Sequence, residues 1–138
     1  GVKISISGLS YKSIMMYESF DSIPLLILDN AVKYSPPGED VHIEFKEGVD
    51  NIDVKISSLG PYVEDHDLSR VFERGFRGES AQQIDGNGIG LYFVKKICEL
   101  HNIQISVQSD SKRRKDINGV IYAPFIVSLK VNDAFDNK

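Results

Sequence analysis

The sequence predicts an α+β domain: a two-layer α/β sandwich with helices on one face of a mixed, mostly antiparallel sheet. Three observations support this fold class. Short segments that alternate apolar and polar residues occur along the chain, as is typical of half-buried strands. Two longer segments carry apolar residues at helical spacing. Neighbouring strand segments joined by short connections indicate antiparallel pairs, which argues against a doubly wound parallel sheet.

The first expected elements are a strand and a helix. Val2 to Ser7 alternates between apolar and polar residues and is predicted to be a strand. A helix is expected to follow over "LLILDNAVKY", with Asp21 and Ser22 as N-cap candidates and Pro24 in its first turn. The segment "SPPG" at 35–38 should end this helix, because proline cannot continue the hydrogen-bond ladder.

The rest of the chain is predicted to hold a hairpin, a long irregular stretch, a second helix and two further strands. The irregular stretch runs from Ser57 to Gly88 and contains one short helical piece around "DLSRVFERGF". A stretch of this length is usually functional or mobile. The remaining expected elements are strands over 41–45, 52–56, 103–109 and about 120–131, and a helix over Ile89 to His101.

Composition limits the classes of function. The 138 residues carry a net charge of −4, which argues against binding nucleic acid through the overall field. The single cysteine, Cys98, is interpreted as a buried core thiol in a reducing compartment. No apolar run is long enough to span a membrane, and no signal peptide is evident. We expect one domain over residues 1–138, as a fragment of a longer chain.

Three polar residues share one face of the first predicted helix. Asn30, Lys33 and Tyr34 are spaced i, i+3 and i+4. Asparagine offers a neutral oxygen suited to Mg²⁺, lysine a point charge for phosphate, and tyrosine a ring on which a base can stack. The alternative is a solvated strip at the end of the helix.

Three glycines stand at the start of the second predicted helix. Gly86, Gly88 and Gly90 occupy every second position of "DGNGIG". Glycine lets backbone N–H groups approach an anion closely, and a helix N-terminus adds partial positive charge. A phosphate site is one interpretation, and a flexible loop with a tight turn is the other.

Four motifs in order resemble those of the ATPase superfamily that comprises gyrase, a heat-shock chaperone, histidine kinases and MutL proteins. "LLILDNAVKYSPPGEDVHI" resembles its asparagine box and "ISSLGPYV" its first glycine box. "VFERGFRG" resembles the phenylalanine box, and "GNGIGLYFVKKICELH" the second glycine box. The resemblance covers about Val2 to Val131 and is greatest to the catalytic ATP-binding domain of sensor histidine kinases.

The resemblance implies a Bergerat-type ATP-binding fold with a lid at about 64–85 and a site for ATP and Mg²⁺. It implies that Asn30 ligates the metal and, with Lys33, carries the catalysis, and that Phe72 and Phe76 anchor the lid. Arg74 and Arg77 are equally balanced between phosphate contacts and solvated lid residues. The nucleotide would be bound by Asn30, Lys33, Tyr34, Ser58, Gly60, Val63, Phe76, Arg77, Gly86, Gly88, Ile89, Gly90 and Leu91.

Three positions depart from the resembled motifs. Ser58 stands where the family has an aspartate that accepts from the adenine amino group, and Tyr62 replaces the second glycine of that box. Bulk at Tyr62 could cover the pocket or fill part of it. Leu26 stands four residues before Asn30, where the gyrase group has a glutamate that activates water. Without that general base, efficient ATP hydrolysis is not expected.

The function implied by the resemblance is a histidine kinase domain. It would bind Mg·ATP and donate the γ-phosphoryl group to a histidine on a separate dimerisation domain of the same protein or a partner, with a response regulator downstream. No nucleic acid and no direct membrane contact is expected, and the location is expected to be cytoplasmic. The alternative is a degenerate, non-catalytic nucleotide-sensing or interaction module. The basic run 112–115 is interpreted as a solvated turn.

Overall fold

The structure is a computed structural model that describes residues 3–8, 12–13, 22–78, 90–132 and 135–136. Its elements are strands, two α-helices and two short 3₁₀ helices. In chain order they are β1 (Lys3–Ser7), β2 (Lys12–Ser13), α1 (Ser22–Tyr34), β3 (Asp40–Glu47), β4 (Ile52–Pro61), η2 (Asp65–Phe72), α2 (Gly90–Leu100), β5 (Ile103–Ser109), η4 (Ser111–Arg113), β6 (Lys115–Ile117), β7 (Val120–Val131) and β8 (Phe135–Asp136).

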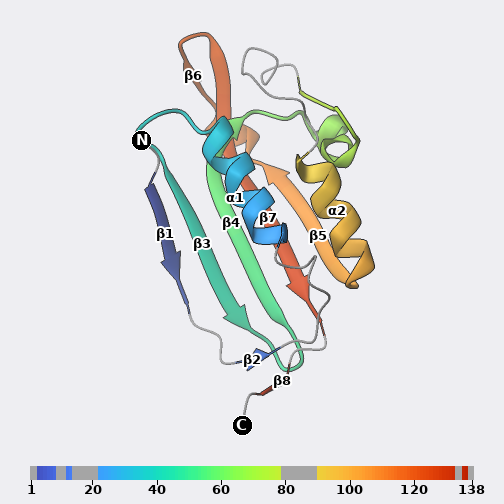
Figure 1. The fold of residues 1–138 in the computed structure, drawn as a ribbon. Helices are drawn as coiled ribbons and strands as arrows, with labels where there is room; N and C mark the ends of the chain where they lie inside the picture. The colour runs from blue at the N-terminus through green and yellow to red at the C-terminus, as the bar shows by residue number, and fades with distance from the viewer. Residues whose placement is uncertain (1–2, 9–11, 14–21, 79–89, 133–134, 137–138) are drawn as a thin grey trace.

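The main sheet has the strand order β1-β3-β4-β7-β5 (Figure 1), and β6 pairs with β7 beyond this path. The β1 and β3 strands are parallel, and α1 lies between them in the chain. All other pairs in the sheet are antiparallel. The predicted fold class, a mixed and mostly antiparallel sheet with helices on one face, is confirmed.

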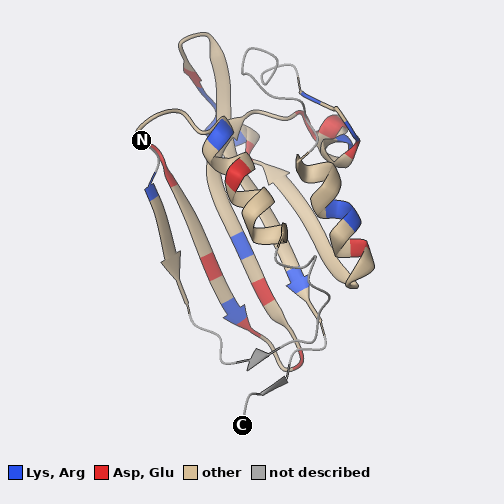
Figure 2. Ribbon diagram, viewed as in Figure 1, with Lys and Arg blue, Asp and Glu red and all other residues tan. Residues whose placement is uncertain are grey.

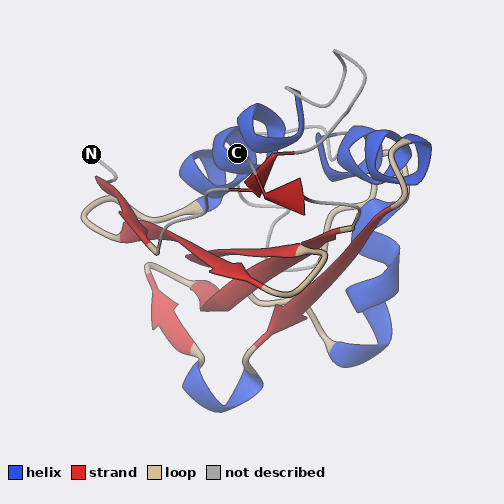
Figure 3. Cartoon of the chain, turned by 90° about the horizontal axis from the view of Figure 1, so that it is seen from below, coloured by secondary structure: helices blue, strands red, loops and turns tan. Residues whose placement is uncertain are grey.

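The core lies between the helices and one face of the sheet. The α1 helix packs on β3, β4 and α2, and α2 packs on β5 and η2. Figure 3 shows the long strands of the main sheet as one twisted layer, and β2 and β8 pair in a separate two-stranded sheet. Alternate residues of the central strands point toward the helices, as strand geometry requires. The largest fully buried side chains among the described residues are Ile23, Ile27, Val41, Val94 and Cys98.

The opposite face of the sheet is polar and carries charges of opposite sign on adjacent strands. Lys46 pairs in register with Asp53, which pairs with Lys130 on β7, and Glu44 pairs with Lys55. Figure 2 marks these positions in blue and red on β3, β4 and β7. Opposite charges directly across a strand pair favour that register. The charge pattern and the buried face therefore select the same strand alignment.

Two segments differ from the sequence prediction. Residues 57–61, expected to be irregular, continue β4, because they pair with β7 as far as the partners Pro61 and Tyr122. The short strand β6 was also missed. It forms a hairpin with β7 through Asn118 and Gly119, both of which have positive φ. An Asn-Gly pair is the preferred sequence for such a turn, so a signal for this hairpin was present.

The interpretation of Cys98 as a core thiol is confirmed. The side chain is fully buried on the inward face of α2. Burial raises the pKa of the Cys98 thiol to about 11, because a thiolate loses its hydration there. The cysteine is therefore a neutral packing residue at physiological pH.

Truncation of the buried face of α1 should destabilise the domain. Ile27 is 1% exposed, whereas Leu25 on the same helix is 69% exposed. We expect Ile27→Ala to lower the free energy of unfolding by about 2–5 kcal/mol, because it leaves a cavity. Leu25→Ala should change it by less than about 0.5 kcal/mol. Urea unfolding monitored by circular dichroism compares the two variants, and equal losses would contradict this assignment of the core.

Candidate functional site

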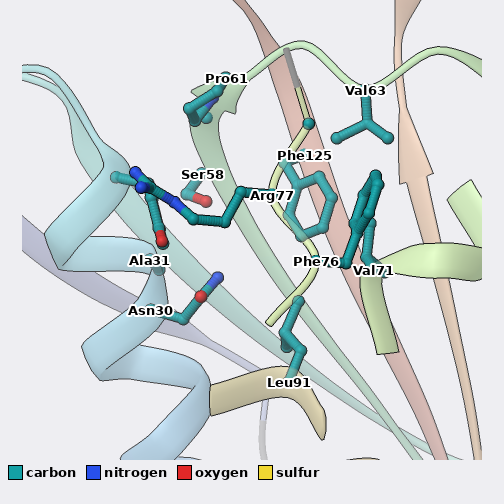
Figure 4. A pocket seen from close by; sticks show the side chains of 13 residues that line it. Asn30, Ala31, Ser58, Pro61, Val63, Val71, Phe76, Arg77, Leu91 and Phe125 are labelled. Carbon is teal, nitrogen blue, oxygen red and sulfur yellow. The ribbon is translucent and has the colours of Figure 1, made fainter. Parts of the chain in front are cut away.

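A pocket opens between α1, β4, the start of α2 and the chain that follows η2 (Figure 4). Its wall is mainly apolar, with a few polar side chains. The lining residues are Asn30, Ala31, Tyr34, Ser58, Gly60, Pro61, Val63, Val71, Phe76, Arg77, Gly78, Leu91 and Phe125. A largely apolar hollow with a small number of polar groups is typical of a small-molecule site.

The α1 helix contributes Asn30 and Tyr34 to the pocket. The inward stripe of this helix includes Ile27 and Ala31, so Asn30 is next to a buried position and is itself half-buried. Tyr34 follows one turn later on the same side, as expected from the helical period. The segment "SPPG" ends the helix after Tyr34, as the sequence predicts, so these two residues stand near its end.

The β4 strand contributes Ser58 and Gly60 from its helix-facing side. Both residues line the pocket, and Ser58 pairs in register with Phe125 of β7. A Cβ added at Gly60 would lie 3.4 Å from the Cβ of Phe125, which is ordinary van der Waals contact. A methyl group there would therefore contact the Phe125 side chain without displacing it. Beyond the strand, the Val63 N–H donates to Ser109 Oγ at 3.1 Å, which holds Val63 at the pocket wall.

The chain after η2 supplies Phe76 and Arg77. Gly75 has a φ of +79°, a conformation that favours glycine, and the chain turns there after η2. Phe72 and Phe76 both pack against the core, and the Arg70 guanidinium lies 4.5 Å from the centre of the Phe76 ring. Phe76 therefore anchors this segment, and the next side chain, Arg77, extends toward α1 (Figure 4).

The two candidate arginines of this segment occupy different environments. Arg77 lines the pocket, and its Nε atom is buried. Arg74 is exposed and is not one of the residues around the pocket. The geometry thus separates two residues that the sequence left equally balanced, and it favours Arg77 as the one directed at a bound molecule.

The α2 helix begins next to Asn30. Gly90 is its first residue, and a Cβ added there would lie 4.0 Å from Asn30 Oδ1. Leu91 closes the pocket beneath this contact. The predicted site residues Gly86, Gly88 and Ile89 lie outside the described residues. Of the second glycine motif, the structure thus places Gly90 and Leu91 at the site.

Lys33 and Tyr62, which were also singled out from the sequence, do not line the pocket. The Lys33 side chain is exposed, and its ammonium lies 5.7 Å from the centre of the Tyr34 ring. The Tyr62 ring lies 5.1 Å from the Arg114 guanidinium, and the Tyr62 hydroxyl donates to Glu64 at 3.5 Å. Burial raises the pKa of the Tyr62 phenol, and Glu64 raises it further. Tyr62 is therefore not among the lining residues, which argues against the alternative that it fills part of the pocket.

The basic run 112–115 is engaged locally. Arg113 forms an ion pair with Asp110 at 2.9 Å, and Lys115 forms one with Glu39 at 3.1 Å. Arg114 lies over Tyr62. These contacts support the interpretation of this run as a solvated structural turn, and they attach the β6 hairpin to the region around β4.

Sequence reasoning did not assign five of the lining residues. Val71, from η2, stands at the start of the motif "VFERGFRG" but was not assigned to the site, and Phe125, from β7, lies outside the four motifs. Their inward position follows only from strand and helix register. The unassigned residues are Ala31, Pro61, Val71, Gly78 and Phe125.

The charge of the pocket suits an anionic ligand. Among the described lining residues, Arg77 is the only one with a formal charge, and none is acidic. The first turn of α2 also carries no acidic residue, so the partial positive charge of its N-terminus is not offset there. Among the described residues, no group of three or more His, Cys, Asp or Glu side chains could hold a metal ion. The described lining thus combines a mainly apolar wall with one positive charge.

Curated proteins with similar sequences include two sensor kinases. The chain is 39% identical over 88 residues to the histidine protein kinase SaeS of Staphylococcus aureus (strain USA300), covering 61% of this chain and 25% of that protein. It is 35% identical over 86 residues to the probable sensor kinase SilS of Salmonella typhimurium, covering 61% of this chain and 17% of that protein. The matched segment thus spans a quarter or less of these relatives.

Within the described residues, no helix is long and apolar enough to cross a membrane.

Solved structures share the fold. The mycobacterial sensor histidine kinase MprB superposes with a TM-score of 0.71 at 24% identity, covering 96% of this chain and 84% of that chain. Full-length ShkA in complex with AMPPNP superposes with a TM-score of 0.70 at 19% identity, covering 99% of this chain and 26% of that chain.

A family model gives the most extensive sequence match. Residues 22–127 match the family described as histidine kinase-, DNA gyrase B-, and HSP90-like ATPase. The matched range begins at the first residue of α1 and ends within β7, so it contains every described element that contributes to the pocket. The chain belongs to the histidine kinase-, DNA gyrase B- and HSP90-like ATPase family.

Proposed function

We propose that this chain is the ATP-binding catalytic domain of a sensor histidine kinase. One observation carries the proposal: Asn30, Ser58 and Arg77, from three separate segments, line a single mainly apolar pocket beside the N-terminus of α2. An adenine ring suits the apolar wall, and a triphosphate suits a site with one arginine and no acidic side chain among its described lining residues. The sensor kinase relatives extend this proposal to the protein of which the domain is part.

The residues of this chain would bind and orient the nucleotide. Gly60 and Phe125 would lie against the base, and Ser58 would meet its polar edge. Arg77 would contact the phosphates, and the backbone of Gly90 would face them at the helix N-terminus. Gly86 and Gly88 are proposed to extend this phosphate cradle, and Lys33 to approach it from α1.

The proposed reaction is phosphoryl transfer to a histidine rather than hydrolysis of ATP. Leu26, one turn before Asn30, packs against the core and has no group that could activate water. Positioning and charge neutralisation supply most of the catalysis of phosphoryl transfer, and the acceptor imidazole is itself the nucleophile. The acceptor would lie on a dimerisation domain, and a response regulator would act downstream. Both would meet this domain in the cytoplasm.

The donor set fits a magnesium ion that arrives with the nucleotide. Mg²⁺ prefers oxygen ligands, and it is usually held by one or two protein groups together with phosphates and water. Asn30 offers one amide oxygen at the pocket, close to Gly90. The ion would neutralise phosphate charge during transfer. Asn30 would therefore be the protein ligand.

Nucleotide binding to the isolated chain tests the proposal directly. With Mg²⁺ present and ADP or ATP at about one hundred times its Kd, linkage should add about 2.7 kcal/mol of stability. This gain should raise the Tm by roughly 5–10 °C. Differential scanning fluorimetry and titration calorimetry give the two measurements. The absence of both heat and thermal shift at millimolar nucleotide would contradict the proposal.

Removal of the Asn30 amide should abolish the effect of magnesium on binding. We expect the Kd for ATP of the Asn30→Ala variant to be the same with Mg²⁺ and with EDTA, because the proposed ligand is missing. Asp29→Ala is the matched control, since Asp29 is exposed on the same helix and should keep the magnesium dependence. Calorimetry in the two buffers measures this difference. An unaltered dependence in Asn30→Ala would show that the metal ligand is misassigned.

The two arginines of the lid segment should have unequal effects. Loss of a hydrogen bond to a charged group costs about 1.5–3 kcal/mol, so Arg77→Ala should weaken ATP binding by roughly 10- to 100-fold. Arg74→Ala removes the same charge from an exposed position and should change the Kd by less than about threefold. Fluorescence titration with a labelled nucleotide compares them. Equal effects would contradict the role of Arg77.

A further inference from the structure

The polar side chains of the pocket do not include a group that only accepts hydrogen bonds. Among the described lining residues, the polar ones are Asn30, Tyr34, Ser58 and Arg77. Serine and tyrosine hydroxyls and the asparagine amide can each donate and accept, and arginine only donates. A carboxylate, which when ionised only accepts, is missing from this set. A ligand therefore does not need a hydrogen-bond donor to satisfy the polar side chains of the pocket.

Ser58 is the polar lining residue that shares β4 with Gly60, against which the base is proposed to lie. Ser58 and Gly60 are two positions apart on the same side of β4, about 7 Å along the strand. Ser58 follows the buried Ile56 on that side and pairs with Phe125. A ring seated against Gly60 and Phe125 would thus present an edge to the Ser58 hydroxyl. The Tyr62 ring, the other departure in this motif, lies against the Arg114 guanidinium. It therefore does not compete with Ser58 for the edge of the base.

Purine bases differ in the group that they carry at position 6. Adenine has an amino group at position 6, which donates, and hypoxanthine and guanine have a carbonyl there, which accepts. A carboxylate would favour the amino group and repel the carbonyl. A serine hydroxyl rotates and can satisfy either one.

We propose that this pocket accepts 6-oxopurine nucleotides nearly as well as adenine nucleotides, and that Ser58 determines this tolerance. The inference rests on the proposed nucleotide site and specifies its substrate class. Strong discrimination requires a buried polar group that is left unpaired by the wrong ligand. Ser58 is not left unpaired by either base.

Separate titrations with ADP and IDP test the inference. The two nucleotides differ only in the group at position 6, which is an amino group in ADP and a carbonyl in IDP, and in the proton that IDP therefore carries on N1. With the wild-type chain and Mg²⁺, we expect the two Kd values to agree within about tenfold. Ser58→Asp should raise the ratio of the IDP Kd to the ADP Kd by at least about tenfold, since the carboxylate opposes the carbonyl. Ser58→Ala should weaken both ligands and leave the ratio within about threefold of wild type.

Ser57→Asp is the matched control. Ser57 is adjacent on β4 but lies on the opposite face of the sheet, in register with His42 and Ile126. The same charge placed there should leave the ratio unchanged. A thermal melt of each variant checks folding, and if Ser58→Asp does not fold, the wild-type and Ser58→Ala ratios decide the question.

The outcomes separate this inference from the function on which it rests. Binding of ADP more than about tenfold tighter than IDP by the wild-type chain would overturn the inference and leave the ATP site standing. An unchanged ratio in a folded Ser58→Asp variant would overturn the role of Ser58. Failure of both nucleotides to bind would overturn the proposed function, and the inference with it.

Discussion

Burial of one stripe of α1 against the sheet is the interaction on which the pocket depends. Ile23, Ile27 and Ala31 form the buried stripe, and each fully buried isoleucine contributes about 1.5–3 kcal/mol relative to an exposed one. Because the helical period is fixed, seating this stripe also sets the direction of Asn30 and Tyr34. The same contacts that stabilise the fold therefore aim the polar groups of α1 at the pocket.

The arrangement of the chain after η2 follows the same principle. Phe72 and Phe76 pack against the core, and Gly75 lets the chain turn between them. The apolar anchors restrict the segment, so Arg77 is held near α1, whereas Arg74 faces solvent. An exposed charged side chain is ordinary for a soluble protein, whereas a guanidinium atom buried in a pocket is uncommon. Packing at the two phenylalanines thus separates the two arginines.

Much of the fold could be predicted because its local signals are strong. The end of α1 at Tyr34 follows from the prolines after it, and β5 and β7 have the bounds that their alternation predicts. The extension of β4 through Pro61 was missed, because "SSLGP" neither alternates nor contains β-branched residues. This segment is a strand because each of its residues pairs with a residue of β7. Pairing between segments that are distant in the sequence does not appear as a local sequence pattern.

The sequence by itself determined the fold class, the family and the residue types available for a nucleotide site. These depend on short-range spacing, such as that of Asn30, Lys33 and Tyr34, and on the order of motifs along the chain. Only the tertiary structure decided which residues share the pocket. Strand register places Phe125 beside Ser58, the chain beyond β4 turns the Tyr62 ring toward Arg114, and core packing separates Arg77 from Arg74. A side chain's direction is set by the partner that its element buries against, and that partner is distant in the sequence.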